Sequence, residues 1–176
     1  VINTAGITTN AGTVTLRGQS VSGAGGITTQ RGAVDIMTSG ALGYTGTINS
    51  SGGSVWLASQ NSSVNNAHVD AGSGAISVNA RSIFGGSYTT TGTAGFTATN
   101  GTINLFDVSA GVVDLSATSA INATVAAGER INANSSGSYV SLQADGSTPL
   151  RLGTVTGTGG IYLSSSGGME QASGGL

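Results

Sequence analysis

The chain has 176 residues, which is long enough for one domain with a buried core. Charged residues make up only 7% of it, lysine and cysteine are absent, and the net charge is −2. This composition argues against a nucleic-acid partner, which needs clustered basic residues, and against a disulfide framework. No apolar run approaches the roughly 20 residues that a transmembrane segment needs.

A short phrase, Gly-x-apolar-x-apolar, recurs about every twenty residues along the chain. The clearest copies are residues 12–16, 32–36, 53–57 and 74–78. Weaker copies are residues 101–105, 111–115, 138–142 and 160–163. The first apolar residues of the clear copies are 20 or 21 residues apart, and adding 20 to Ile76 reaches Phe96. A fixed period of this kind indicates a repeat architecture.

Each unit of the repeat contains three short pieces that read as strands. In chain order, the expected strands of the regular part lie near residues 7–9, 14–16, 21–22, 27–29, 34–36, 42–44, 48–50, 55–57, 64–66, 69–71, 76–78 and 83–84. The register is disturbed afterwards, and we expect irregular turns or loop insertions within residues 97–139. No segment has the apolar spacing of an amphipathic helix.

These features predict an all-β fold, a parallel β-helix (β-solenoid) of about eight turns with three short strands per turn. One turn cannot bury its own apolar residues, but stacked turns bury them in continuous columns. Glycine and asparagine are expected at corners that need a positive φ. The alternative is an antiparallel sandwich or barrel, which does not require one phrase to return at a fixed step. We therefore expect residues 1–176 to form a single β-helix segment, cut from a longer repeat-containing protein.

The middle residue of each phrase should point outward, because side chains alternate along a strand. The expected outward column is Thr15, Asp35, Trp56, Ser77, Thr97, then Asn104 or Asp114, then Ser141 and Tyr162. Trp56 and Tyr162 are candidate surface contacts, since an exposed aromatic ring can stack on a sugar or a partner protein. The competing interpretation is that Trp56 only covers neighbouring polar side chains.

The sequence offers little catalytic or metal-binding chemistry. Asp35 and Asp114 are expected four turns apart, near 20 Å, whereas glycoside hydrolysis uses two carboxyl groups about 5–9.5 Å apart. His68 is the single histidine, and no cysteine can assist it in a metal site. Asp107 and Asp114 are close in sequence but read as solvated acids. We therefore predict no enzyme activity, catalytic residue, metal or cofactor. Glu129 and Arg130, adjacent charges in the irregular stretch, are further candidate surface contacts.

Three segments carry a resemblance to a known family: residues 11–16, residues 26–30 and residues 167–175, which read AGTVTL, GITTQ and GGMEQASGG. They resemble the repeats of filamentous-haemagglutinin-like exoproteins, which are large Gram-negative adhesins often exported by two-partner secretion. The resemblance implies a right-handed β-helix shaft, secreted or on the cell surface. The Asn-Pro-Asn motifs of that family's secretion domain are absent, since Pro149 is the only proline.

The first hypothesis is therefore a structural or adhesive shaft segment of a secreted bacterial surface protein. Its partners would be host or bacterial surface glycans or proteins, or neighbouring copies stacked end to end or laterally. A self-assembling extracellular filament subunit is one alternative, because open strand edges promote association. A polysaccharide-acting β-helix enzyme or a tailspike is the other.

Overall fold

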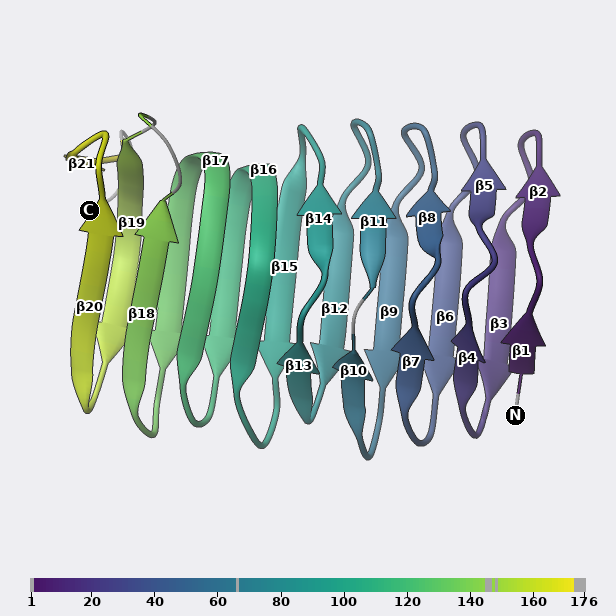
Figure 1. Ribbon diagram of the computed structural model, residues 1–176, viewed down its shortest axis with the longest axis horizontal. Coiled ribbons are helices and arrows are strands. Elements are labelled where there is room, and N and C mark those ends of the chain that lie inside the picture. The colour runs from purple at the N-terminus through teal and green to yellow at the C-terminus, as the bar shows by residue number, and fades with distance from the viewer. Residues whose placement is uncertain (1, 66, 145–146, 148, 173–176) are drawn as a thin grey trace.

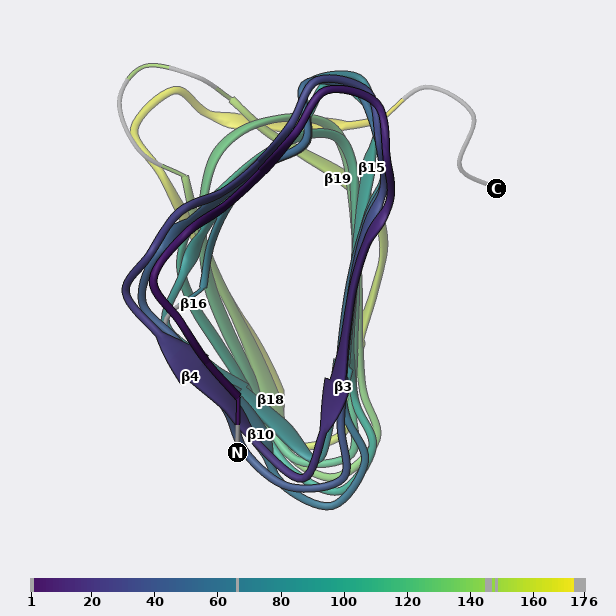
Figure 2. The ribbon, with the colours of Figure 1, turned by 90° about the vertical axis from the view of Figure 1, so that its right-hand side faces the viewer.

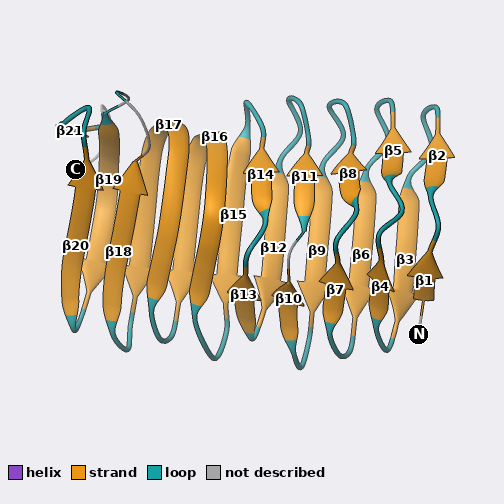
Figure 3. Cartoon of the chain, viewed as in Figure 1, coloured by secondary structure: helices purple, strands orange, loops and turns teal. Residues whose placement is uncertain are grey.

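The computed structural model describes residues 2–65, 67–144, 147 and 149–172. These residues form 21 strands, and the secondary structure assigned to them contains no helix (Figure 3). Every strand pairing is parallel, and the strands follow one another along the long axis of the molecule (Figure 1). The predicted all-β parallel solenoid of about eight turns is thus confirmed.

The short strands fall into three stacks, because each one pairs with the strand three places later in the chain. The first stack contains β1 (Ile2–Thr4), β4 (Val21–Gly23), β7 (Leu42–Tyr44), β10 (Ser63–Asn65), β13 (Ser82–Phe84), β18 (Tyr139–Ala144) and β20 (Gly160–Ser165). The second contains β2 (Ile7–Thr9), β5 (Ile27–Thr29), β8 (Thr47–Asn49), β11 (His68–Asp70) and β14 (Ser87–Thr89). The third contains β3 (Val14–Gly18), β6 (Val34–Thr38), β9 (Val55–Ser59), β12 (Ile76–Ala80), β15 (Thr93–Ala98), β19 (Leu150–Gly157) and β21 (Met169–Gln171). Viewed along the axis, β3, β15 and β19 lie on the long straight side of a triangular outline (Figure 2).

Two long strands, β16 (Ile103–Ala117) and β17 (Ile121–Ser135), pass through all three stacks without a break. They pair with each other over their whole length, with register shifts around Val108. The step between most paired residues of β16 and β17 is 18, as from Ile103 to Ile121, compared with 20 from Val14 to Val34 and 21 from Val34 to Val55. Most of residues 97–139, where irregular turns or insertions were expected, thus lie in two continuous strands.

The core is a set of apolar columns running along the axis. Val14, Val34, Val55 and Ile76 stack in one column, each paired with the next, and all are at most 6% exposed. Tyr88 packs edge to face on Phe96, with ring centroids 4.8 Å apart. Such stacking removes from water the side chains that one turn could not bury alone.

The glycines that open the second, third and fourth clear copies of the phrase are required by close approach of the turns. A Cβ atom on Gly32 would lie 2.1 Å from the carbonyl oxygen of Gly12, and one on Gly53 would lie 2.2 Å from that of Gly32. Neither glycine has a positive φ. The expectation of positive φ was therefore wrong for these glycines, and steric contact between turns explains them.

The register predicted for Phe96 and for the weaker copies at residues 138–142 and 160–163 was also wrong, whereas Asp114 takes the outward position offered for it. Phe96 pairs with Val78, and the partner of Ile76 is Ala94. Val140 and Ile161 belong to the first stack, where they follow Ile121, and not to the third stack with Val14. The alternation of apolar and polar residues is the same in both stacks, so the phrase alone could not separate them.

Candidate functional site

The outer surface of the third stack, here called the broad face, carries two parallel rows of outward side chains. The first row consists of Asp35, Trp56, Ser77, Gly95, Asp114, Asn132 and Thr154. The second row consists of Met37, Ala58, Asn79, Thr97, Ser116, Asn134 and Thr156. The rows lie two residues apart along each strand, about 7 Å. They therefore form two walls that run along the axis of the solenoid.

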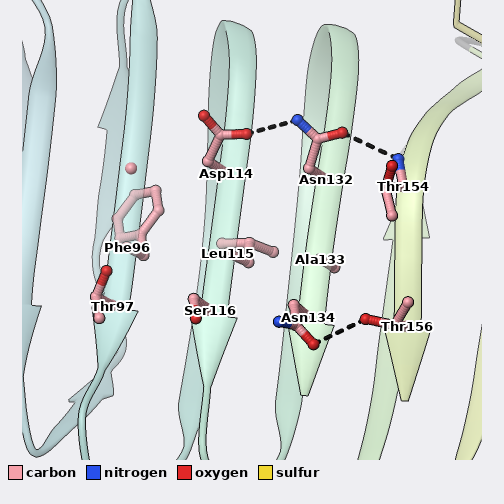
Figure 4. Close-up of a pocket in the computed structure, with 11 residues that line it drawn as sticks. Phe96, Thr97, Asp114, Leu115, Ser116, Asn132, Ala133, Asn134, Thr154 and Thr156 are labelled. Atoms are coloured by element: carbon pink, nitrogen blue, oxygen red, sulfur yellow. Dashed lines mark hydrogen bonds between the residues drawn. The ribbon is translucent and has the colours of Figure 1, made fainter. Parts of the chain in front are cut away.

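Between these walls, β15, β16, β17 and β19 enclose a furrow of about 420 Å³ (Figure 4). Its floor is the strand backbone at Phe96, Leu115 and Ala133, whose side chains point into the core and are at most 3% exposed. Gly95 has no side chain and leaves the first wall low at one end of the furrow, where a Cβ atom would meet only a carbonyl oxygen 4.0 Å away. The furrow is thus open and shallow, and six of its eleven lining residues have neutral polar side chains.

A hydrogen-bonded chain of side chains holds the first wall of the furrow in place. Asn132 donates from Nδ2 to Oδ1 of Asp114 at 2.6 Å, and its Oδ1 accepts from the backbone N–H of Thr154 at 3.0 Å (Figure 4). Thr154 lies in a bulge, because Ile131 pairs with Leu152 whereas Ala133 pairs with Val155. The bulge leaves the backbone N–H of Thr154 without the carbonyl acceptor of a regular strand pair, and the side-chain carbonyl of Asn132 takes that place.

The second wall keeps hydrogen-bonding groups available. Thr156 donates its hydroxyl to Oδ1 of Asn134 at 2.8 Å, which leaves the Nδ2 group of Asn134 without a partner among the described residues. Within the same described part of the chain, the hydroxyls of Thr97 and Ser116 make no hydrogen bond, and both residues are exposed. These groups can therefore donate to and accept from a ligand.

A second concavity of about 240 Å³, here called the Trp56 hollow, lies on the same face. Met37, Ala58 and Asn79 line it from the second row, and Trp56 lines it from the first. Trp56 is 39% exposed, as its register predicts, while the small Ala58 leaves space beside the indole. Beyond the hollow, Arg17 forms an ion pair with Asp35 at 3.3 Å.

The other predicted surface contacts lie apart from Trp56. Tyr162 belongs to the first stack, is 63% exposed, and packs edge to face on Tyr139 with centroids 6.2 Å apart. Arg130 lies on the broad face beside the furrow, and its side-chain carbons are 3.0 and 3.2 Å from the position that a Cβ on Gly153 would take. The side chain of Glu129 is outside the described residues.

The acidic residues and the histidine are dispersed over the molecule. Asp35 and Asp114 occupy the same row four strand spacings apart, about 19 Å, as predicted. Asp107 and His68 both belong to the second stack, where they pair with Ser87 from opposite sides. No group of three or more His, Cys, Asp or Glu side chains in the described ranges could hold a metal ion. None of the residues described by the structure forms a helix suited to crossing a membrane.

Four residues of the furrow were not predicted from the sequence: Asn132, Asn134, Thr154 and Thr156. Their signal was present as polar–apolar–polar triplets, Asn132-Ala133-Asn134 and Thr154-Val155-Thr156, two residues apart in each strand. Placing them beside Asp114 requires the 18-residue step of this region. That step departs from the period of the clear phrase copies.

The fold defines the chain as a β-solenoid with a polar furrow on its broadest face. Comparison with known proteins yields no matching family model, no matching curated protein and no matching solved structure. The likeness to haemagglutinin-like exoproteins accordingly depends on the repeat pattern described above.

Proposed function

We propose that the chain is a non-catalytic, adhesive shaft segment of a secreted bacterial surface protein. The observation that carries this proposal is the unbroken parallel stack, which presents long rows of outward side chains on a continuous core. Such a stack is long and stiff, because each turn is hydrogen-bonded through its backbone to the turns above and below it. The repeat resemblance to haemagglutinin-like exoproteins supports the same assignment, with a glycan or protein on another surface as partner.

The spacing of the acids supports binding in preference to hydrolysis. Asp35 and Asp114 are about 19 Å apart on the broad face, more than the 9.5 Å upper limit for a pair of glycosidase carboxyls. Asp107 lies in another stack. Any single glycosidic bond of a ligand on the broad face would thus lie near only one of these two carboxylates.

Attachment of coated beads tests the proposal. Fluorescent beads carrying the folded chain are applied to an array of immobilised glycans and surface proteins, with beads carrying heat-unfolded chain as the control. The same glycans are incubated with free protein and assayed for new reducing ends and for unsaturated products. We expect attachment of folded-chain beads without any product. Accumulation of product, or equal attachment of both bead types, would contradict the proposal.

A filament subunit is the second candidate, favoured by the exposed apolar residues of the outermost described turn. Ile161 is 44% exposed and Met169 is 49% exposed, although their neighbours in the preceding turn are buried. A further parallel strand, from the same longer chain or from another copy, would cover them. Sedimentation velocity over a hundredfold concentration range separates these cases: growing linear oligomers support the filament, and a constant monomer supports the shaft.

A further inference from the structure

We propose that the broad face is a binding track for a neutral glycan chain, which lies along the solenoid axis from Met37 to Thr156. This inference rests on the proposed adhesive function and specifies its ligand class and its site. The track crosses seven strands (β6, β9, β12, β15, β16, β17 and β19), or about 29 Å at the usual spacing of strands. It therefore suits an extended polymer better than a single small molecule.

The track is continuous because the Trp56 hollow and the furrow adjoin. Asn79 lines the hollow, Thr97 lines the furrow, and the two residues are direct partners on β12 and β15. The furrow floor continues as backbone under Phe96 and Leu115. A ligand that enters beside Trp56 can thus extend into the furrow without crossing a ridge of bulky side chains.

The groups that line the furrow favour a neutral, hydroxyl-rich ligand. Asp114 is the single charged residue of the furrow lining, and the remaining polar groups are hydroxyls and amides. Its Oδ1 accepts from Asn132, so Oδ2 remains to accept a sugar hydroxyl. Sugar hydroxyls can both donate to the carboxylate and accept from Asn134, Thr97 and Ser116. A polyanion would meet Asp114 within the furrow, while the one cation beside it in the described part of the chain, Arg130, is not among the lining residues.

An extended peptide fits the furrow less well than a glycan. The strands that form the floor are already paired with their neighbours on both sides, as β16 is with β15 and β17. A peptide strand could therefore not add to the sheet, and its backbone N–H and C=O groups would find only the scattered side chains of the walls in place of a strand partner. A sugar chain makes its hydrogen bonds through side hydroxyls, which the two walls can meet.

Trp56 provides the apolar end of the track. Its indole stands in the first row, while Met37 and Ala58 lie in the second row beside it. The C–H face of a sugar ring can stack against an exposed indole, and the amide of Asn79 is close enough to line the same hollow. Aromatic stacking at one end and hydrogen bonds along the furrow would together hold one chain in register.

Isothermal titration calorimetry with the folded chain tests this inference. The probes are cellohexaose, chitohexaose and maltohexaose, with a hexamer of galacturonic acid as the charged comparison. Trp56→Ala is paired with Phe84→Ala, because Phe84 is 41% exposed on the first stack and so matches Trp56 in exposure but not in position. Ser116→Arg, which would fill the furrow, is paired with Asn122→Arg on the outer side of the first stack.

We expect at least one neutral hexasaccharide to bind more tightly than the charged hexamer. Trp56→Ala should weaken that binding about fivefold or more, and Ser116→Arg should weaken it at least as much, whereas each control stays within twofold of the wild type. Circular dichroism of every variant confirms that it is folded. Absence of binding by all three neutral probes, or equal losses in site and control variants, would overturn the inference.

These outcomes separate the inference from the function on which it rests. Attachment of beads to immobilised proteins alone would leave the adhesive shaft standing and overturn the glycan track. Cleavage of a hexasaccharide that binds at Trp56 and Ser116 would support the track and contradict the non-catalytic function.

Discussion

The sharpest structural prediction concerns Gly53, the glycine that opens the third copy of the phrase. A Cβ at this position would lie 2.2 Å from the carbonyl oxygen of Gly32, and Cβ atoms essentially never come within 3.0 Å of another heavy atom. Gly53→Ala must therefore move the two turns apart by at least 0.8 Å at this corner. The neighbouring bond from the N–H of Val34 to the carbonyl of Ser54, now 2.9 Å, would be stretched.

The expected cost follows from these two effects. Overpacking of a tight contact costs about 1–3 kcal/mol, and a weakened backbone hydrogen bond adds about 0.5–1.5 kcal/mol. Alanine also lowers the conformational entropy of the unfolded chain, and this effect offsets about 0.4–1 kcal/mol of the destabilisation. We therefore expect Gly53→Ala to lower the free energy of unfolding by about 2–3 kcal/mol.

Gly12→Ala is the matched control, since Gly12 opens the first copy of the phrase and a Cβ there would meet nothing within 4 Å. It should leave stability unchanged or raise it by up to about 1 kcal/mol. Urea unfolding followed by far-ultraviolet circular dichroism gives both values. Equal effects of the two substitutions, or a neutral Gly53→Ala, would refute the close-approach explanation.

The remaining predictions concern polar groups that are buried or partly buried. Tyr88→Phe should be neutral or stabilising by about 1 kcal/mol in thermal unfolding, because the Tyr88 hydroxyl is buried without a hydrogen-bond partner. Burial raises the pKa of Tyr88, because the charged phenolate is disfavoured in the core. The free energy that the neutral phenol contributes to folding is therefore fully present below the unfolded pKa of about 10 and is lost as pH rises above it. The loss of stability at alkaline pH should be smaller in Tyr88→Phe. Thr29→Val should cost about 1–2 kcal/mol in urea unfolding, since the buried Thr29 hydroxyl donates to the carbonyl of Gly32, and a neutral result would contradict that role. Asn132→Asp should destabilise by about 1–2 kcal/mol at pH 7, because two carboxylates would face each other; the double variant Asp114→Asn/Asn132→Asp should recover most of the loss, and failure to recover would argue against the side-chain bond.

The sequence predicts the core columns well because alternation along a strand is a local property. Val34, Ile36 and Trp56 take the inward and outward positions that the phrase assigns to them. The furrow was not predictable in this way, because it depends on which turns are adjacent. Asp114 and Asn132 become neighbours only through an 18-residue step and a long strand that turns two corners. A one-residue error in such a step moves every later side chain to another face.

The roles of the glycines likewise could not be predicted from the sequence alone. A glycine in a repeat indicates either a positive φ or a close approach, and composition does not distinguish them. Gly52 has a φ of +121°, whereas its neighbour Gly53 does not have a positive φ and is fixed by contact with Gly32. The distinction needs the separation of adjacent turns, which three-dimensional structure supplies.

The central claim is that this solenoid binds a glycan along its broad face without altering it. Amide chemical shifts of the isotope-labelled chain, recorded while the best-binding neutral hexasaccharide is added, test it most directly. We predict shifts at Trp56, Asn79, Thr97, Ser116 and Asn134, with the sugar signals of the hexasaccharide unchanged in chemical identity after prolonged incubation. Shifts centred on Tyr162 and the first stack, or the appearance of shorter sugars, would contradict the claim.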